Sequence, residues 1–357
     1  MFNYKILLFS TLLFCFGCLD EIDLDVPAGV ENSIVVRGEL LKENPSRIRV
    51  TVDRVFNFDL STLSPFNARA VTLFDEAGNN LDIPSSQDGL HEYVFTGSES
   101  IEVDFGKSYS LRVTTFDGRT YESTMEELMP STEQQGTLES VPSTIEVLDE
   151  DNNVNQFPVA QVRINAPLTL PGKDQKARFL WIPERTFKVT DDKSQTCYIT
   201  NQTDVNSIHV FDGSIFAGDV VNGFELSAVR ANFELSEGYY YTVYQRSLTA
   251  GAFAYWNQTK QIVERTGSLF EPPAGRVNSN FVNVEDETDN IFGYFTAFAQ
   301  DTIRLYIDPA QYGFDPEESI CPPSVPPPPG GGCAVPVCCD CAILPGSETI
   351  RPDFWVE

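Results

Sequence analysis

The stretch YSLRVTTF-DG-RTYEST, residues 109–124, carries the clearest fold signal in the chain. Apolar and polar residues alternate on both sides of Asp117-Gly118, as they do in strands with one buried face. Asp-Gly between two such runs is typical of a type I′ turn, in which both central residues take a positive φ. The stretch therefore predicts a β-hairpin.

Similar runs lie on the N-terminal side of this hairpin, at residues 33–40, 47–52, 70–74 and 91–95. In the second of them Ile48, Val50 and Val52 alternate with polar residues, which gives the strand one core face. Turn residues separate the runs. Short strands at spacings of about ten residues are typical of an immunoglobulin-like β-sandwich. We assign this sandwich to residues 30–125.

A second β-rich block is expected at residues 141–316, after a stretch without periodicity at 126–140 that predicts a linker. Its best strand candidates are residues 159–164, 177–182, 196–200, 238–245 and 303–307. The predicted fold class is therefore all-β, with two β-sandwich domains and a Pro/Gly/Cys-rich C-terminal tail at residues 317–357.

The second block also contains the one expected helix, residues 248–266. Ser247 or Thr249 can cap its start, and Gly267 can end it. Five residues share one side of this helix at a period of 3.6, so we expect that side to pack on the sheet. They are Ala252, Phe253, Trp256, Lys260 and Val263.

The N-terminus reads as a lipoprotein signal peptide over residues 1–17. Lys5 precedes an apolar run that is too short to span a bilayer, and Gly17 stands directly before Cys18. Cys18 occupies the position that is acylated in bacterial lipoproteins. The alternative is an ordinary signal peptide that is cleaved elsewhere. Residues 18–29 place four acids close behind this cysteine and predict a solvated, acidic tether.

The chain has 24 Lys and Arg against 52 Asp and Glu, a net charge of −28. This charge repels phosphate backbones, which excludes nucleic acid as a partner. It also opposes adhesion to anionic headgroups, so contact with a membrane is expected to depend on the lipid anchor.

Six cysteines remain once Cys15 and Cys18 are set aside. An even number in an exported protein predicts three disulfides, whose connectivity the sequence leaves open. A metal site that uses the C-x-x-C spacing of Cys338 and Cys341 is the alternative. The disulfide candidates are Cys197, Cys321, Cys333, Cys338, Cys339 and Cys341.

Catalytic motifs are absent from the sequence, and the two histidines, His91 and His209, lie in strand-like segments. A pair of carboxylates brought together in space could still serve a glycosidase, and residues 149–153 offer oxygens for calcium without a complete EF-hand pattern. We therefore predict no catalytic residue, no metal and no cofactor. Four aromatic residues could line a ligand surface, with burial in the core as the alternative that we expect for most of them: Tyr239, Tyr240, Tyr241 and Trp256.

Several motifs resemble a family of Bacteroidota lipoproteins, domain of unknown function 4249. They include YQRSL (244–248), AYW (254–256), TGSLFEP (266–272), FGYF (292–295) and RPDFW (351–355). VRGEL (36–40), AVTL (70–73) and YSL (109–111) extend the likeness over the N-terminal half. Relative to the family, Cys333 and Cys339 look like additions, which implies a bond between them.

The resemblance implies a lipid-anchored protein at the outer membrane, facing the cell surface. Such proteins typically accompany TonB-dependent transporters, and the acidic tether is similar to the sorting signal of Bacteroidota surface lipoproteins. The expected function is that of a non-enzymatic binding or docking partner of such a transporter in nutrient uptake. The alternatives are an accessory subunit of a secretion or assembly machine, and a surface hydrolase.

Overall fold

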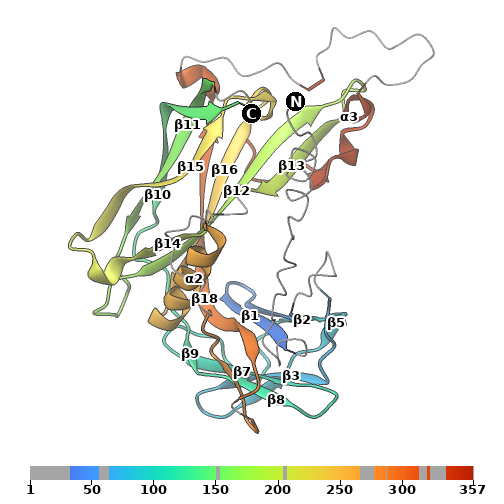
Figure 1. The fold of residues 1–357 in the computed structure, drawn as a ribbon, viewed down its shortest axis with the longest axis vertical. Helices are drawn as coiled ribbons and strands as arrows, with labels where there is room; N and C mark the ends of the chain where they lie inside the picture. Colours follow the sequence, from blue (N-terminus) through green and yellow to red (C-terminus); the bar gives the residue numbers. More distant parts are fainter. Residues whose placement is uncertain are drawn as a thin grey trace, which may run out of the picture.

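The computed structural model describes residues 33–55, 64–149, 153–203, 207–265, 277–286, 288–312, 320–321 and 335–356. Strands make up most of this part of the chain, and the predicted all-β fold is confirmed. Two β units are stacked along the longest axis (Figure 1). The signal peptide, Cys18 and the acidic tether lie outside the described residues.

The first unit is a two-layered sandwich. One layer holds β1, β2, β6, β5 and the first half of β18, and the other holds β17, β8, β7, β3, β4 and β9. Alternation in β1 and β2 turns Val36, Val50 and Val52 into the core between the layers. The strands are Ile34–Lys42 (β1), Arg47–Arg54 (β2), Ala70–Asp75 (β3), Asn80–Asp82 (β4), Ser85–Gln87 (β5), Leu90–Val94 (β6), Ser108–Thr114 (β7), Thr120–Ser123 (β8), Glu126–Glu127 (β9) and Phe281–Asn283 (β17).

The second unit packs the sheet β19-β13-β12-β16-β18, with β14 beside β12, against the three-stranded sheet β10-β11-β15. Phe179 and Trp181 of β12 contribute large rings to the core between the sheets. The strands are Thr137–Leu148 (β10), Val154–Pro167 (β11), Arg178–Thr190 (β12), Thr196–Gln202 (β13), His209–Asp212 (β14), Val220–Arg230 (β15), Tyr239–Leu248 (β16) and Ser347–Glu348 (β19).

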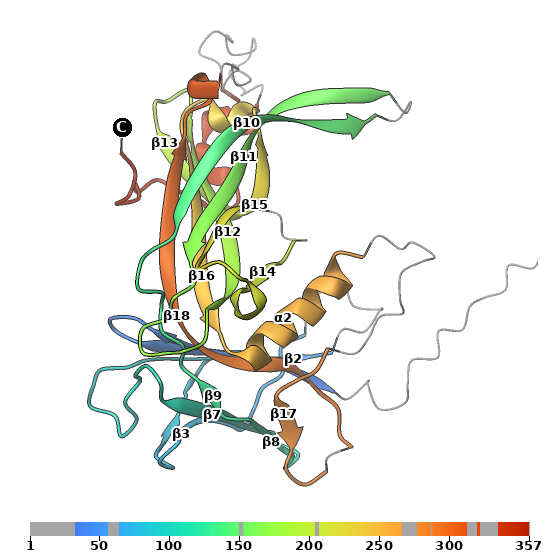
Figure 2. The same cartoon turned by 90° about the vertical axis from the view of Figure 1, so that its left-hand side faces the viewer.

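One strand, Ile291–Ile307 (β18), belongs to both units. Residues 291–299 pair in parallel with β1, and residues 300–307 pair antiparallel with β16. In Figure 2 the strand crosses the first unit and then turns upward into the second. Residues 281–299, which the sequence assigns to the second block, therefore complete the first unit. Gly293 makes the parallel pairing possible, because any Cβ there would lie 1.9 Å from the Val36 carbonyl oxygen.

The segment expected to be a linker, residues 126–140, is buried along its first half. Glu126 and Glu127 form β9, Leu128 and Met129 are almost fully buried, and Met129 forms a bridge with Phe298 of β18. The segment does connect the two units. It lacks a sequence period because its first half crosses from one core to the other as buried chain, whereas residues 133–135 are exposed and β10 begins at residue 137.

The hairpin at residues 109–124 is confirmed, but the type I′ turn is wrong. Gly118 has a φ of +95°, whereas Asp117 does not take a positive φ. The loop runs over residues 115–119, where the Gly118 N–H donates to the Thr115 carbonyl at 3.2 Å. The Asp117 carboxylate accepts from the Thr115 hydroxyl and pairs with Arg119, and these side-chain bonds favour the longer loop.

The predicted helix is observed as Ala250–Val263 (α2), capped by Thr249. The Thr249 hydroxyl accepts from the Ala252 N–H at 3.1 Å. Ala252, Phe253 and Trp256 pack beside β12 and β18 as expected, whereas Val263 at the far end of the ridge is 42% exposed. The remaining helical turns are Gly213–Ile215 (η2), Phe233–Leu235 (η3), Pro309–Tyr312 (η4), Pro336–Cys339 (α3) and Cys341–Ile343 (η5). Within the described ranges, no helix has the length and apolar character needed to cross a bilayer.

Candidate functional site

Disulfides attach the C-terminal segment, residues 335–356, to the second unit. Cys197 of β13 is bonded to Cys341, and Cys321 is bonded to Cys338. Cys339 is also disulfide-bonded, while Cys333, the partner implied for it, lies outside the described residues. Both cysteines of the C-x-x-C pair are therefore engaged in disulfides. The segment also adds β19 to the edge of β13.

The candidate binding site is a hollow of about 640 Å³ beside the end of this segment. Residues distant in sequence meet there because β12, β16 and β18 are neighbours in the large sheet. The lining residues are Lys188, Glu237, Gly238, Tyr240, Tyr306, Trp355 and Val356. We call this hollow the aromatic pocket.

Ring contacts fix the aromatic wall of the pocket. The ring of Tyr240 lies 5.0 Å from that of Trp355, 5.4 Å from Phe354 and 5.3 Å from Tyr306, between centroids. Tyr198 of β13 contacts the other side of Trp355 at 5.0 Å. Tyr240 and Trp355 are buried by these contacts, whereas Tyr306 is 46% exposed and presents its ring to solvent.

The backbone around Trp355 explains its close fit. Gly238 has a φ of +122°, and a Cβ at this position would lie 3.0 Å from the Trp355 ring. Glycine at position 238 therefore allows both the turn into β16 and the approach of the indole. The Val356 N–H also donates to the Tyr240 hydroxyl at 3.2 Å.

Charged groups of both signs surround the aromatic wall. Lys188 and Glu237 line the pocket, and the Glu237 carboxylate is oriented by the Thr190 hydroxyl, which donates to it at 2.7 Å. The Arg304 guanidinium stacks over the Phe354 ring at 4.2 Å. An open wall of aromatic rings with a few oriented polar groups is typical of sites for small organic ligands.

The four aromatic candidates from the sequence separate into different environments. Tyr239 and Tyr241 point into the core, and Tyr240 points from the opposite face into the pocket, as alternation along β16 requires. Trp256 packs on α2 against Tyr255. Lys188, Glu237 and Tyr306 were not predicted from the sequence, because only the pairing of strands far apart in the chain brings them together.

A buried carboxyl group, Glu126, lies where the two units meet. It accepts hydrogen bonds from the hydroxyls of Thr249, at the start of α2, and of Tyr294 in β18. Burial raises the pKa of Glu126 to about 7, and the nearby Glu127 carboxylate adds to this rise. Glu126 thus bonds the first unit to the helix and to the shared strand.

A second hollow, of about 400 Å³, also lies at this junction. Arg246 of β16 reaches into it, donates to Glu39 of β1 at 2.8 Å and stacks on the Phe298 ring at 4.2 Å. Arg246 and Glu39 bond the two units to each other, whereas Arg49 and Glu92 pair within the first unit at 3.5 Å. We call the contacts that Glu126 and Arg246 make between the units the joint.

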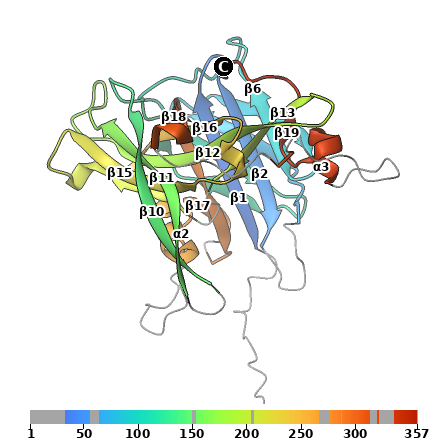
Figure 3. The same cartoon turned by 90° about the horizontal axis from the view of Figure 1, so that it is seen from above.

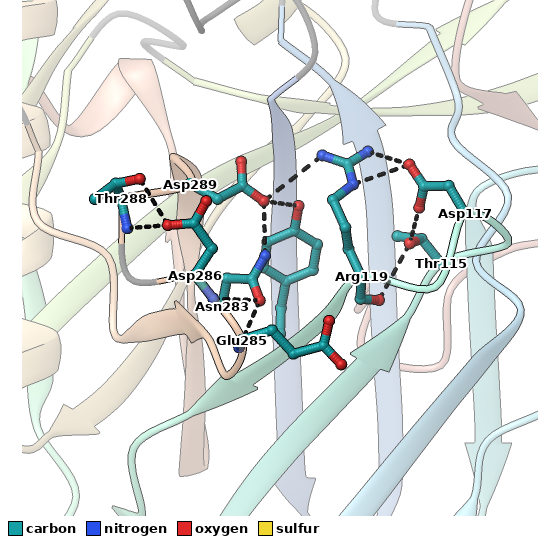
Figure 4. A network of polar contacts seen from close by, with 9 residues as sticks. Thr115, Asp117, Arg119, Asn283, Glu285, Asp286, Thr288 and Asp289 are labelled. Carbon is teal, nitrogen blue, oxygen red and sulfur yellow. Dashed lines mark hydrogen bonds and ion pairs between the residues drawn. The ribbon is translucent and has the colours of Figure 1, made fainter.

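The far end of the first unit carries a polar network (Figure 4). Asp289 accepts from the Tyr121 hydroxyl at 2.6 Å and from the Asn283 amide at 2.8 Å. Arg119 lies between Asp289, at 3.7 Å, and Asp117, at 2.9 Å. These contacts join the β7–β8 hairpin to the loop after β17. The network therefore stabilises the fold of the first unit.

The remaining polar candidates have structural partners. His91 lies 3.1 Å through Nδ1 from the Ile83 carbonyl oxygen, and both histidines are buried. Asp149 accepts from the amides of Asn153 and Asn155 and so closes the β10–β11 hairpin. In the part of the chain that the structure describes, no three His, Cys, Asp or Glu side chains are grouped to hold a metal ion.

Comparison with known proteins identifies a family. The model of the family described as "Domain of unknown function (DUF4249)" matches residues 19–304, which is most of the chain. No curated protein and no solved structure matches the chain. The chain belongs to the DUF4249 family. The matched region includes the first unit and most of the second and ends within β18, before Tyr306 and the C-terminal segment that complete the aromatic pocket.

Proposed function

We propose that this DUF4249 protein is a surface-exposed, lipid-anchored protein of a Bacteroidota outer membrane. In this role it binds a small nutrient molecule without chemical conversion and works as the docking partner of a TonB-dependent transporter. Cys18 is the acylated residue, and residues 18–29 are the tether that gives the two β units their distance from the membrane.

The aromatic pocket is the observation that carries this proposal. It is open, it combines the exposed Tyr306 ring with Lys188 and Glu237, and a disulfide-bonded segment holds its wall in place. A rigid wall lowers the entropy lost on binding. The ligand that fits these groups is a small polar molecule with an apolar face.

The position of the acid whose pKa is raised most favours binding over hydrolysis. Glu126, whose pKa burial raises to about 7, is held by Thr249 and Tyr294 in the joint and does not line the aromatic pocket. A general acid must reach the substrate to transfer its proton. The raised pKa of Glu126 is therefore a feature of the joint.

The first experiment uses the full-length, tagged protein and outer membranes of the cells that produce it. Solubilised outer membranes are passed over tagged protein, and the retained proteins are identified by mass spectrometry. We expect a TonB-dependent transporter to be retained, and we expect deletion of the protein to impair uptake of one class of nutrient. The proposal fails if no transporter is retained and deletion leaves every uptake phenotype intact.

A substitution in the pocket separates ligand binding from docking. Tyr306→Ala removes an aromatic ring that is 46% exposed, so the protein should fold normally. We expect this variant to retain the transporter and to lose the nutrient uptake that depends on the protein. Phe116→Ala is the matched control, because this ring is 73% exposed in the first unit, away from the pocket. Equal uptake by the two variants would exclude the pocket as the ligand site.

A further inference from the structure

The β10–β11 hairpin extends beyond the body of the second unit as a two-stranded arm (Figure 2). β15 pairs with β11 only as far as Val159, which lies opposite Arg230. Beyond that point residues 144–148 and 154–158 form a strand ladder only with each other, and the Ala231 N–H donates to the Pro158 carbonyl at the base of this ladder, at 3.2 Å. We call these ten residues the arm. A two-stranded ribbon without a covering layer is marginally stable in water, so an exposed arm requires an explanation.

The tip of the arm exposes apolar side chains. Val147, Leu148 and Val154 are 43%, 63% and 57% exposed. Their neighbours Ile145 and Phe157 are half-buried, and the ring of Phe157 is covered by the Arg230 guanidinium at 3.5 Å. Apolar exposure therefore concentrates at the end of the arm that is farthest from the body.

The pairing register distributes these side chains over both faces of the ribbon. Leu148 is opposite Val154, so the two share one face, and Val147 points to the other face. A flat partner surface could cover only one of these faces. Burial of all three side chains requires a slot that the tip enters.

The charge of the arm indicates which charge the slot on the partner should carry. Glu146 is the one charged residue of the arm and is exposed, exposed Asp149 follows directly after Leu148, and the sequence from residue 120 to residue 162 contains no Lys or Arg. An acidic arm is repelled by anionic lipid headgroups and attracted to a basic protein surface. Pro142 in the middle of β10 opposes the alternative of strand addition along this free edge, because it removes a backbone donor.

The direction of the arm agrees with the proposed anchoring. In Figures 2 and 3 the arm points away from the side on which the C-terminal end lies. β1, which follows the proposed tether, begins on the side to which the arm points. In a protein anchored through Cys18, the chain would therefore enter the body on the side of the arm and not on the side of the C-terminal end.

We infer that the arm is a docking device that inserts its apolar tip into a slot with a basic rim on a protein partner in the membrane. The partner that we name is the TonB-dependent transporter, and in this one respect the inference rests on the proposed function. It is independent of the aromatic pocket, because the arm and the pocket lie on different parts of the second unit and share no residue.

Photo-crosslinking in living cells tests the inference with the full-length protein. A benzophenone amino acid replaces Leu148 at the tip, and the crosslinked segment is identified by mass spectrometry. We expect a crosslink to a TonB-dependent transporter at a segment rich in Lys and Arg. The same group in place of Phe116, an exposed residue of the first unit, serves as the control and should not crosslink to that segment.

Substitutions provide the second measurement. Leu148→Asp with Val154→Asp should reduce capture of the transporter about ten-fold, as expected when a contact central to an interface is lost. Ile350→Asp alters a residue that is 78% exposed in the C-terminal segment and should leave capture unchanged. Glu146→Lys should weaken capture, whereas Glu285→Lys in the first unit should not. All variants are first shown to keep the wild-type circular dichroism and melting temperature.

The outcomes separate this inference from the proposed function. A crosslink only to lipid or to a second copy of the chain, no crosslink, or undiminished capture by the double variant would overturn the inference, and captured transporter would then still support the proposed function. A crosslink from position 148 to a basic slot on a protein other than a transporter would support the arm and contradict the transporter partnership.

Discussion

The two β units hold their ends together by different means. The first unit closes its far end with a polar network, in which Asp289 is bonded by Tyr121 and Asn283 from neighbouring strands. The second unit fixes its far end with covalent bonds, of which Cys197–Cys341 ties the last segment to β13. The aromatic pocket lies at the covalently fixed end, and the arm also belongs to the second unit.

This difference indicates a division of tasks between the units. The first unit encloses its core between two layers, and the polar groups at its far end bond one another. The second unit exposes aromatic rings in a pocket and apolar side chains on an arm, and neither feature can contribute much to its own stability. The disulfides compensate for this exposure. β18 passes through both units, so the first unit also supports the one that carries the proposed binding surfaces.

Removal of the Cys197–Cys341 disulfide should cause the largest difference in stability between the two units. Cys197 and Cys341 are 144 residues apart, and in the chain-entropy model a bond that closes such a loop stabilises the fold by about 5 kcal/mol. We expect Cys197→Ser with Cys341→Ser to lower the free energy of unfolding by about this amount. Urea unfolding measures the loss, and hydrogen exchange should show it first in β13 and β19.

The second disulfide is the matched control. Cys321 and Cys338 are 17 residues apart, so their replacement by serine should cost only about 3 kcal/mol in the same model. In both variants β3 and β7 of the first unit should keep their protection from exchange. Equal loss of protection in both units would show that the second unit does not depend on the disulfides more than the first.

The carboxyl group at the joint gives the next largest effect, which depends on pH. Glu126 has a pKa of about 7 in the folded protein against an ordinary 4.5. Between these values the folded protein keeps a proton that the unfolded chain has released, so stability falls as pH rises through this window. The fall amounts to about 3 kcal/mol. Urea unfolding from pH 4 to pH 8 measures it.

Two variants test the assignment to Glu126. Glu126→Gln cannot ionise, so its free energy of unfolding should lack this fall with pH. Tyr294→Phe removes a hydroxyl whose hydrogen bond lowers the pKa of Glu126, so the fall should begin at the same pH and extend to higher pH. An unchanged pH slope in Glu126→Gln would show that another group causes the effect, and that the joint tolerates a charged Glu126.

The sequence was sufficient for elements with one buried face and insufficient for the connection between the units. β2 and β7 alternate between apolar and polar residues, and both were predicted. Only residues 303–307 of β18 were predicted, because its first half is buried on both faces and shows no alternation. The parallel pairing with β1 joins residues about 250 positions apart in the sequence, and local patterns contain no information on such a pairing.

The residues of the aromatic pocket were also predictable only in part from the sequence. Alternation along β16 separates Tyr240 from Tyr239 and Tyr241, but only the sheet order shows which face is the core. Tyr306, Lys188 and Trp355 meet Tyr240 through strand pairing and the tail. The cysteines predicted disulfides and left their connectivity open, because pairing depends on which chain segments meet in space.

The smallest change in stability is expected when one side-chain hydrogen bond is removed from each unit. Tyr121→Phe removes the bond of 2.6 Å to Asp289, and Tyr244→Phe removes the bond of 3.0 Å to Glu184 in the second unit. Tyr121 is fully buried and its bond is shorter, so its loss should cost about 1.5 kcal/mol and that of Tyr244 about 0.5 kcal/mol. Melting temperatures of the two variants measure the difference. A larger loss for Tyr244→Phe would contradict the view that side-chain hydrogen bonds matter more in the first unit, because the second unit would then depend on them as well as on its disulfides.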